Sequence, residues 1–421
     1  MKQLLTASIL WSALAWSANA APVSLDGLIQ SALDQHPSLQ AARQSAAAQA
    51  ARVGAAQAPN LPQVNLNSSL QYSTNLSNAQ TSSQPFALST AGLTLRQQLY
   101  DFGKTDSEVA IARANADISM LAAQSQAVEV AYGVRQAYLQ WVRAAQIERL
   151  ARTRLDSASR LAAQAEAFWK AGKRSKIDAT RAAATLAQAR AELIAAHTGV
   201  EQAQRTLSAA AGQEALVAGE PAFPALPAET SQPLATLEQA ALERHPALQT
   251  SAVRLHRADA TLRSAEKANL PDINLDVNYG LRARDMTPGQ NWTAGVGFSM
   301  PLFNGFSSDR LRSAAGSELA ATEATARDQA LTIRTGVQKA YLALAGTRDR
   351  LPASQASVAS AQENLALAEG RYQSGVGSII EVSDAQALLA SAETELVRAQ
   401  TDYHLAAADL LRAAGLTGIS K

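Results

Sequence analysis

Four stretches of the chain alternate between apolar and polar residues. In the clearest one, 273–281, Ile273 and Val277 lie on one face of the segment and Asn274 lies on the other. A period of two is typical of a β-strand that has one apolar and one polar face. The same alternation recurs elsewhere, in places more weakly, and we therefore predict strands at 64–72, 86–95, 273–281 and 292–300.

The segments between these strands are rich in strong helix formers. No proline occurs from Phe86 to Glu220, and Ala, Gln, Arg, Glu and Leu dominate this part of the chain. One uninterrupted helix over 105–171 would be roughly 100 Å long. Pro352 predicts a kink or a short break in the corresponding helix farther along the chain. We predict helices at 105–171, 176–211, 308–374 and 379–414, with Gly172 and Gly375 at the turns between them.

The apolar positions of these helices are mostly alanine, with sparse leucine and valine. A helix this long cannot bury itself in a compact domain, and each alanine supplies little buried area. Many helices lying side by side would compensate for this. The composition therefore predicts an assembly of several chains.

The chain also contains one unit twice. The segment LDGLIQSALDQHPSLQ near the start matches LATLEQAALERHPALQ in the second half, so that His36-Pro37 falls on His245-Pro246. The correspondence continues with Gly172 on Gly375, and repeat one carries a longer loop between its first two strands. Such duplication indicates two tandem structural repeats. We divide the chain into 1–20, repeat one at 21–212, a proline-rich linker at 213–233, and repeat two at 234–421.

Residues 1–20 are typical of a secretory signal peptide. Lys2 precedes an apolar run, and Ala18-Asn19-Ala20 matches an A-x-A cleavage site. Without Lys2 the count of Lys and Arg falls from 37 to 36 and equals the 36 Asp and Glu, so no basic excess argues for a nucleic-acid partner. Nothing after residue 20 is an apolar stretch long enough for a membrane-spanning helix.

Candidate chemistry is sparse. The chain has no cysteine, which excludes disulfides and thiolate metal sites. His36 and His245 each precede a proline, which indicates a bend between helical segments rather than a metal pair. No glycine-rich phosphate loop or nucleophile motif occurs. We therefore expect no enzyme activity, no cofactor and no metal.

The strands admit two interpretations. They form hairpins that pack on the helices, or they belong to a transmembrane β-barrel, for which strands of about 9–11 residues have the right length. Four strands cannot close a membrane barrel, and open edges in lipid would leave backbone groups unpaired. The barrel interpretation therefore also requires several chains.

At this point the motifs resemble a known family, the TolC-like outer-membrane efflux proteins, over essentially the whole mature length. The marks are the doubled L-x(3)-AL-x(2)-HP-x-LQ segment, the NLP turn before each first strand, and the turns QLYDFGK and PLFNGFS. FWKAGKRSKIDATRAAATL at 168–186 and its partner RYQSGVGSIIEVSDAQALL at 371–389 add to them. Order, spacing and duplication together carry the resemblance.

The resemblance implies a mainly helical fold with a β-barrel portion. Three chains would form a twelve-stranded barrel in outer-membrane lipid and an α-barrel across the periplasm. It implies an exit duct of a tripartite efflux or type I secretion system, with a periplasmic adaptor protein and an inner-membrane transporter as partners. The adaptor would dock at the hairpin tips, at Gly172 and Gly375.

The resemblance also implies a gate at the periplasmic end. Glu381 and Asp384 match acidic positions that line the constriction, and their spacing of three places both on one helix face. Asp178 and Tyr372 match residues that link neighbouring coiled coils. At two positions this chain departs from the family pattern, which has an arginine where it has Gly377 and a hydroxyl residue where it has Ile177.

A different class of protein remains an alternative. A periplasmic coiled-coil scaffold or adaptor without a channel would share the signal peptide, the long helices and the repeats. The apolar stripes of the predicted strands argue against it, because an adaptor has no use for them.

Overall fold

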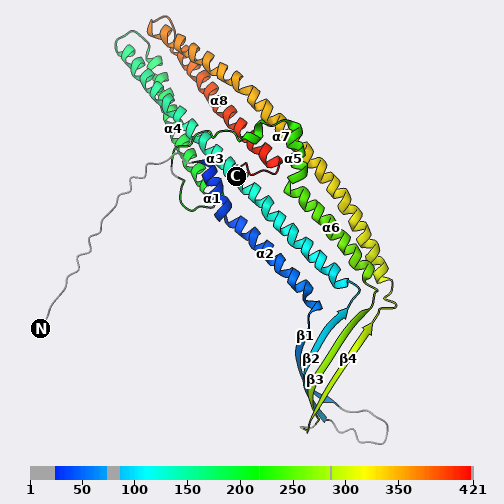
Figure 1. Ribbon diagram of the computed structural model, residues 1–421. Coiled ribbons are helices and arrows are strands. Elements are labelled where there is room, and N and C mark those ends of the chain that lie inside the picture. The colour runs from blue at the N-terminus through cyan, green and yellow to red at the C-terminus, as the bar shows by residue number, and fades with distance from the viewer. Residues whose placement is uncertain (1–23, 74–85, 218, 285–286, 419–421) are drawn as a thin grey trace, which may run out of the picture.

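The computed structural model describes residues 24–418 except 74–85, 218 and 285–286. The signal peptide predicted at 1–20 lies outside the described residues. Two long helical hairpins lie side by side, and both point their tips away from a small sheet at the opposite end of the molecule (Figure 1).

The four long helices are confirmed to within one residue at either end. Each repeat contributes one helix of 67 residues and one of 35 residues, joined at a tight turn. At about 1.5 Å per residue the longer helices are roughly 100 Å long. The hairpins consist of α3 (Lys104–Lys170) with α4 (Lys176–Ala210), and α7 (Ser307–Gln373) with α8 (Ile379–Ala413).

Four shorter helices pack on the long helices. Because α4 reaches along only part of α3, the remainder of α3 packs against α1 and α2, and repeat two uses α5 and α6 on α7 in the same way (Figure 1). In each repeat the two short helices and the 35-residue helix thus cover the 67-residue helix nearly from end to end. Their bounds are α1 Leu25–Gln35, α2 Pro37–Gln57, α5 Leu234–Arg244 and α6 Pro246–Lys267.

The repeated His-Pro pair forms the joint between these helices. His245 Nδ1 accepts a hydrogen bond from the backbone N–H of Ala247 at 3.1 Å, so the imidazole caps α6. Burial lowers the pKa of His245, which favours the neutral ring that this hydrogen bond needs. Gly415, just after α8, has φ +72°, and a Cβ there would lie 2.9 Å from the His245 ring. His36 and Gly212 form the same joint in repeat one, with the cap at 3.2 Å.

The predicted strands are confirmed as one antiparallel sheet with the order β1-β2-β3-β4. The second strand is longer than predicted, because it continues through Tyr100, and the fourth strand begins at Thr287 rather than at residue 292. Two 3-10 turns, η1 (Ala58–Asn60) and η2 (Ala228–Ser231), complete the elements. The strands span β1 Gln63–Ser73, β2 Phe86–Tyr100, β3 Asp272–Arg284 and β4 Thr287–Ser299.

The strand register keeps the two faces of the sheet chemically distinct. One row across the strands joins Val64, Leu95, Val277 and Ala294. The adjacent row lies on the opposite face of the sheet and joins Asn65, Thr94, Asn278 and Thr293. Side chains alternate between faces along a strand, so this pairing gathers the apolar residues on one face and the polar residues on the other.

The strand-to-helix corners need unusual backbone. Phe102 and Gly103 have φ +57° and +78°, and at the second corner Gly305 and Phe306 have φ +66° and +63°. Left-handed backbone is costly for a residue with a Cβ. At each corner one glycine adopts it at low cost, and one phenylalanine adopts it despite the cost. At the first corner Asp101 accepts hydrogen bonds from the backbone N–H groups of Gly103 and Thr105, at 2.9 and 2.6 Å.

Of the kink or short break predicted at Pro352, the break does not occur, because α7 continues through this residue. A proline in a helix leaves the carbonyl of the residue four positions before it without its partner. Here that residue is Arg348, and both Pro352 and Arg348 are exposed, so water can satisfy the carbonyl. The helix therefore tolerates the proline.

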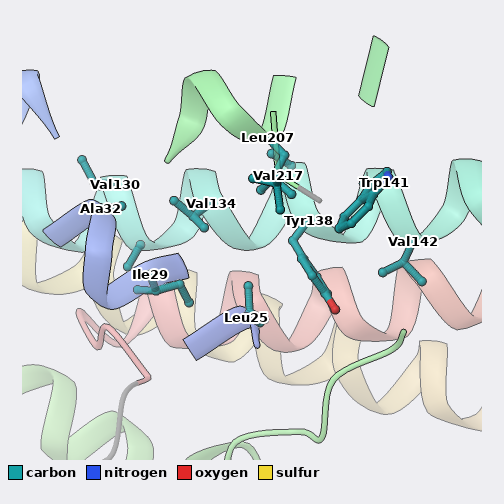
Figure 2. Close-up of a cluster of buried hydrophobic side chains, with 12 residues drawn as sticks. Leu25, Ile29, Ala32, Val130, Val134, Tyr138, Trp141, Val142, Leu207 and Val217 are labelled. Atoms are coloured by element: carbon teal, nitrogen blue, oxygen red, sulfur yellow. The ribbon is translucent and has the colours of Figure 1, made fainter. Parts of the chain in front are cut away.

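The largest apolar cluster lies where α1 and the end of α4 meet the middle of α3 (Figure 2). Trp141 is 1% exposed, and its ring lies edge-on to Tyr138 with centroids 6.0 Å apart. Val217 of the predicted linker packs into the cluster, and the Tyr138 hydroxyl donates to the carbonyl of Ala222 at 2.9 Å. The linker therefore fastens to the first repeat rather than passing freely between the two.

Candidate functional site at the hairpin tips

Both hairpins turn through the same local structure. Gly172 has φ +68° and Gly375 has φ +87°, the left-handed conformation that ends a helix in a Schellman motif. In the first tip the N–H of Lys173 donates to the carbonyl of Phe168 at 2.9 Å, which closes that motif. Three residues after each glycine, Ser175 and Ser378 cap the returning helix. Both glycines therefore lie at the tips, as predicted.

An apolar cluster joins the two tips to each other. It draws on all four long helices, so the two hairpins pack against each other at their tips. Its largest member is Tyr372, which is 1% exposed and lies 6.0 Å from the Phe168 ring between centroids. The buried members are Leu161, Ala165, Ala182, Ala368, Tyr372, Ile379, Val382 and Ala385.

The two predicted gate acids have different surroundings. Glu381 forms a capping box with Ser378 and pairs with Arg371 of its own hairpin at 3.1 Å. Asp384 is exposed, and in the described part of the chain it makes no ion pair or hydrogen bond. One turn of α8 therefore presents one free carboxylate and one that is already engaged.

Asp178 and Tyr372 lie on opposite sides of the seam. Burial and then the negative charge of Asp178 raise the pKa of Tyr372, whereas Arg174 lowers it. The Tyr372 hydroxyl is buried and has no hydrogen-bond partner among the described residues. Asp178 therefore acts on Tyr372 through its charge, not through a direct hydrogen bond.

Arg174 makes the direct contacts across the seam. From the turn between α3 and α4, its Nη2 donates to the carbonyl of Gly377 at 2.8 Å and to that of Tyr372 at 3.3 Å. Its guanidinium carbon also lies 5.0 Å from the centroid of the Tyr372 ring, at cation–π distance. One side chain of repeat one thus contacts both the backbone and the aromatic ring of repeat two.

Gly377 has no room for a side chain. A Cβ there would lie 2.8 Å from the Cβ of Arg371 and 3.0 Å from its carbonyl carbon. The family pattern has an arginine at this position, but the turn in this chain is too tight for one. Ile177, the other departure from that pattern, is exposed in the opposite turn.

The contacts of Arg174 are not among the predictions made above, although the two repeats contain a signal for them. The two copies align with an offset of 203 residues at the tips, as in Gly172 and Gly375, so that Arg174 falls on Gly377. The arginine absent from the second copy stands at the matching place in the first.

A second functional surface lies on the sheet. Its apolar face is exposed along all four strands, whereas the polar face carries an ion pair between Arg96 and Asp276 at 2.8 Å. None of the helices in the described ranges is both long and apolar enough to span a membrane. The exposed apolar side chains are Val64, Leu66, Leu70, Tyr72, Leu93, Tyr279, Leu281, Trp292, Val296 and Phe298.

Long paired hairpins, a sheet with one exposed apolar face and a sequence repeated in tandem define a class of outer-membrane proteins. The family model for outer membrane efflux proteins matches residues 28–213 and 237–416, one match for each repeat. The chain belongs to the outer membrane efflux protein family, and it is located in the outer membrane.

Individual relatives match nearly the whole chain. An outer membrane efflux protein of Brucella suis, BepC, is 24% identical over 98% of this chain and 90% of its own length. The pyoverdine export outer membrane protein OpmQ of Pseudomonas aeruginosa is 26% identical over 95% and 86%. A crystal structure of a membrane protein from Pseudomonas aeruginosa superposes with a TM-score of 0.83 at 25% identity, covering 99% of this chain and 96% of that one.

Proposed function

We propose that the chain is the exit duct of a tripartite efflux or type I secretion system, a passive conduit without catalysis. The observation that carries this proposal is the polarity of the molecule. An exposed apolar sheet face lies at one end, and two packed hairpin tips lie roughly 100 Å of helix away. A lipid-anchored end and a closable end are the two parts that such a duct needs.

The sheet supports a trimer. Within the described residues β1 and β4 pair on one side only, and an unpaired edge in lipid costs several kcal/mol for each unsatisfied backbone group. Three chains joined edge to edge would supply twelve strands, an even number in the usual range for outer-membrane barrels. The polar face with Arg96, Asn278 and Thr293 would then line the water-filled interior, and the apolar face would contact lipid.

The tips would form the periplasmic gate. In a trimer Glu381 and Asp384 would contribute six carboxylates around one axis, which attracts cations and repels anions. Since Arg371 already neutralises Glu381, Asp384 supplies the larger share of this effect. Asp178 and Tyr372 belong to the same gate through the seam between the hairpins.

Ion conductance of the purified protein in a planar bilayer tests the duct and its gate together. We expect discrete cation-selective openings from the wild type, and a loss of selectivity in Glu381→Ala/Asp384→Ala because the ring charge is removed. Asp384→Ala alone should produce most of that change. Openings with unchanged selectivity in the double variant would refute the assignment of the gate, and a folded wild-type trimer that never conducts would favour the scaffold alternative.

The energy for export would come from an inner-membrane transporter, which a periplasmic adaptor links to the tips at Gly172 and Gly375. Lys173 and Lys176 are exposed in the first turn and offer a basic contact surface there. We expect Lys173→Glu/Lys176→Glu to abolish export in cells while leaving the trimer intact on gels. Arg205→Glu reverses an exposed charge far from the tips and should leave export unchanged. Export at the wild-type level in the double variant would refute docking at this turn.

A further inference from the structure

A cavity lies between the two hairpins. Its volume is about 470 Å³, which is within the range of sites that hold drug-sized molecules. It is lined by α3 and α4 of one hairpin and by α8 of the other, and α7 contributes Leu365. Along α3, α4 and α7 its lining lies farther from the tips than the cluster around Tyr372. The cavity is therefore separate from the contacts that join the tips.

Three polar atoms of the lining residues are buried and have no partner. They are Nε of Arg154, Nε2 of Gln386 and Oγ of Ser383, and none of them makes a hydrogen bond with the described residues. Buried polar groups in folded proteins are nearly always hydrogen-bonded, either to protein or to a bound molecule. These three groups therefore indicate that the cavity receives a polar occupant.

Arg154 is held in place in the lining. Its Nη2 donates to the Thr394 hydroxyl at 2.9 Å and to the carbonyl of Ala390, both on α8. These contacts use one end of the guanidinium and leave the Nε–H group as a free donor. Because the donor is already fixed, a molecule that accepts its hydrogen would not have to order the side chain.

The charges of the lining have a negative balance. Besides Arg154, the charged lining residues are Glu192 and Glu393, so two carboxylates stand against one guanidinium. Glu192 Oε2 lies 3.9 Å from Arg154 Nη1, and Glu192 also accepts a hydrogen bond from Gln188 at 3.1 Å. One negative charge is thus left over for an occupant.

Glu393 is the carboxylate without a partner. It is half-buried, and in the described part of the chain it makes no ion pair or hydrogen bond. Burial raises the pKa of Glu393, whereas the positive charge of Arg154 lowers it. A cation bound next to Glu393 would stabilise the charged form of this carboxylate.

We propose that this cavity binds a small organic cation that also carries hydrogen-bond acceptors. The positive group would pair with the Glu393 carboxylate, and the acceptors would take the hydrogens of Arg154 and Gln386. The alanines and leucines of the lining would contact the carbon skeleton of the molecule. The site lies between helices, and its assignment is independent of the proposed duct and gate.

The charged groups of the cavity are not a general feature of the repeated hairpins. With the offset of 203 residues between the copies, Arg154 corresponds to Ser357 and Glu393 corresponds to Arg190. Neither the fixed donor nor the unpaired carboxylate is therefore present at the matching positions. Both copies form the same hairpin, so helix packing alone does not require these two residues.

Fluorescence anisotropy of the purified full-length protein in detergent tests the binding. The probes are rhodamine 123, a monocation with ester and ether oxygens, and fluorescein, an anion with the same xanthene ring system. We expect saturable binding of rhodamine 123 and much weaker binding of fluorescein. Glu393→Gln removes the charge at nearly constant size. It should weaken the binding of rhodamine 123 by about tenfold or more, because a charge-assisted hydrogen bond is lost.

Two control variants separate this site from other acidic surfaces. Glu363→Gln removes an exposed charge of α7 that does not line the cavity, and it should leave the affinity for rhodamine 123 unchanged. Asp384→Asn removes the free carboxylate of the proposed gate and should also leave the affinity unchanged. Loss of binding in Asp384→Asn but not in Glu393→Gln would place the dye at the gate and refute the cavity site.

Thiol protection tests the location directly, because the chain has no cysteine. Ser157 lines the cavity, so Ser157→Cys places a single thiol there. Rhodamine 123 at about ten times its Kd should slow the reaction of this thiol with N-ethylmaleimide by about tenfold. Ser391→Cys places the thiol at an exposed position of α8, where the rate should not change. Absence of saturable binding, or an unchanged rate for Ser157→Cys, would mean that the cavity holds water alone and would refute the proposal.

Discussion

Replacing Trp141 by alanine is expected to destabilise the protein by about 3–5 kcal/mol. The side chain is 1% exposed and lies in the cluster where α1 and α4 meet α3 (Figure 2). Elsewhere the long helices pack mainly through alanines, which bury little area each, so much of the apolar stabilisation of repeat one is concentrated in this cluster. Removing its largest side chain leaves a cavity that rigid helices of this length cannot close. The measurement is guanidinium unfolding of the detergent-solubilised protein, followed by circular dichroism.

Trp169→Ala is the matched control, because Trp169 is 39% exposed near the first tip. The Lys176 ammonium lies 5.7 Å from the centroid of its ring, a cation–π contact at an exposed site, so we expect a loss below about 1 kcal/mol. The equivalent of Trp141 in repeat two is Leu344, which is also buried. An equal, small loss for both tryptophan variants would show that the cluster does not dominate the stability of repeat one.

Most helices, strands and turns of this fold could be predicted from the sequence, because each follows from a local residue pattern. Alternation at Ile273 and Val277 predicts a strand whatever its partners, and a run free of proline predicts a helix wherever it packs. Gly172 and Gly375 mark turns because left-handed backbone favours glycine. These are local properties, so one sequence read alone was enough to predict them.

The structural features that were not predicted from the sequence depend on residues far away in the chain or on exposure to solvent. The continuation of α7 through Pro352 depends on the exposure of the freed carbonyl, which a sequence pattern does not contain. The left-handed backbone of Phe102 and Phe306 breaks a local preference, and only the corner geometry requires it. Arg174 meets Gly377 only after two hairpins have packed, although the repeat alignment places them at equivalent positions.

The distribution of side-chain size has a functional consequence. Large apolar side chains are gathered in three buried clusters, around Trp141, around Leu344 and around Tyr372, and on the exposed apolar face of the sheet, whereas the helices between them present mostly alanine. Small side chains allow close approach of helices without strong attachment, and such surfaces can slide or part at low cost. At the tips the two hairpins are joined by specific contacts, such as those of Arg174 with the Gly377 carbonyl and the Tyr372 ring.

Replacing Ala294 by arginine is expected to prevent most of the protein from assembling in the outer membrane. Ala294 lies at the middle of β4, opposite Val277 on the apolar face of the sheet. An arginine on the lipid face of a membrane barrel costs about 2–4 kcal/mol near the bilayer midplane. Because a trimer would carry three copies of the substitution, this cost would apply three times in one barrel. The measurement is the fraction of protein that reaches the outer membrane as an oligomer, by membrane fractionation and native gels.

Thr293→Arg is the matched control, because it places the same charge on the opposite face of the same strand. Thr293 is the adjacent residue of the same strand, pairs with Asn278, and lies on the polar face. In a water-filled barrel its arginine would be solvated like Arg96, so we expect near-normal assembly and a change only in ion selectivity. If both variants assembled equally well, the apolar face would not contact lipid, and the barrel orientation would be wrong. If both failed equally, the sheet would be packed on both faces, as in a protein whose strands do not enclose water.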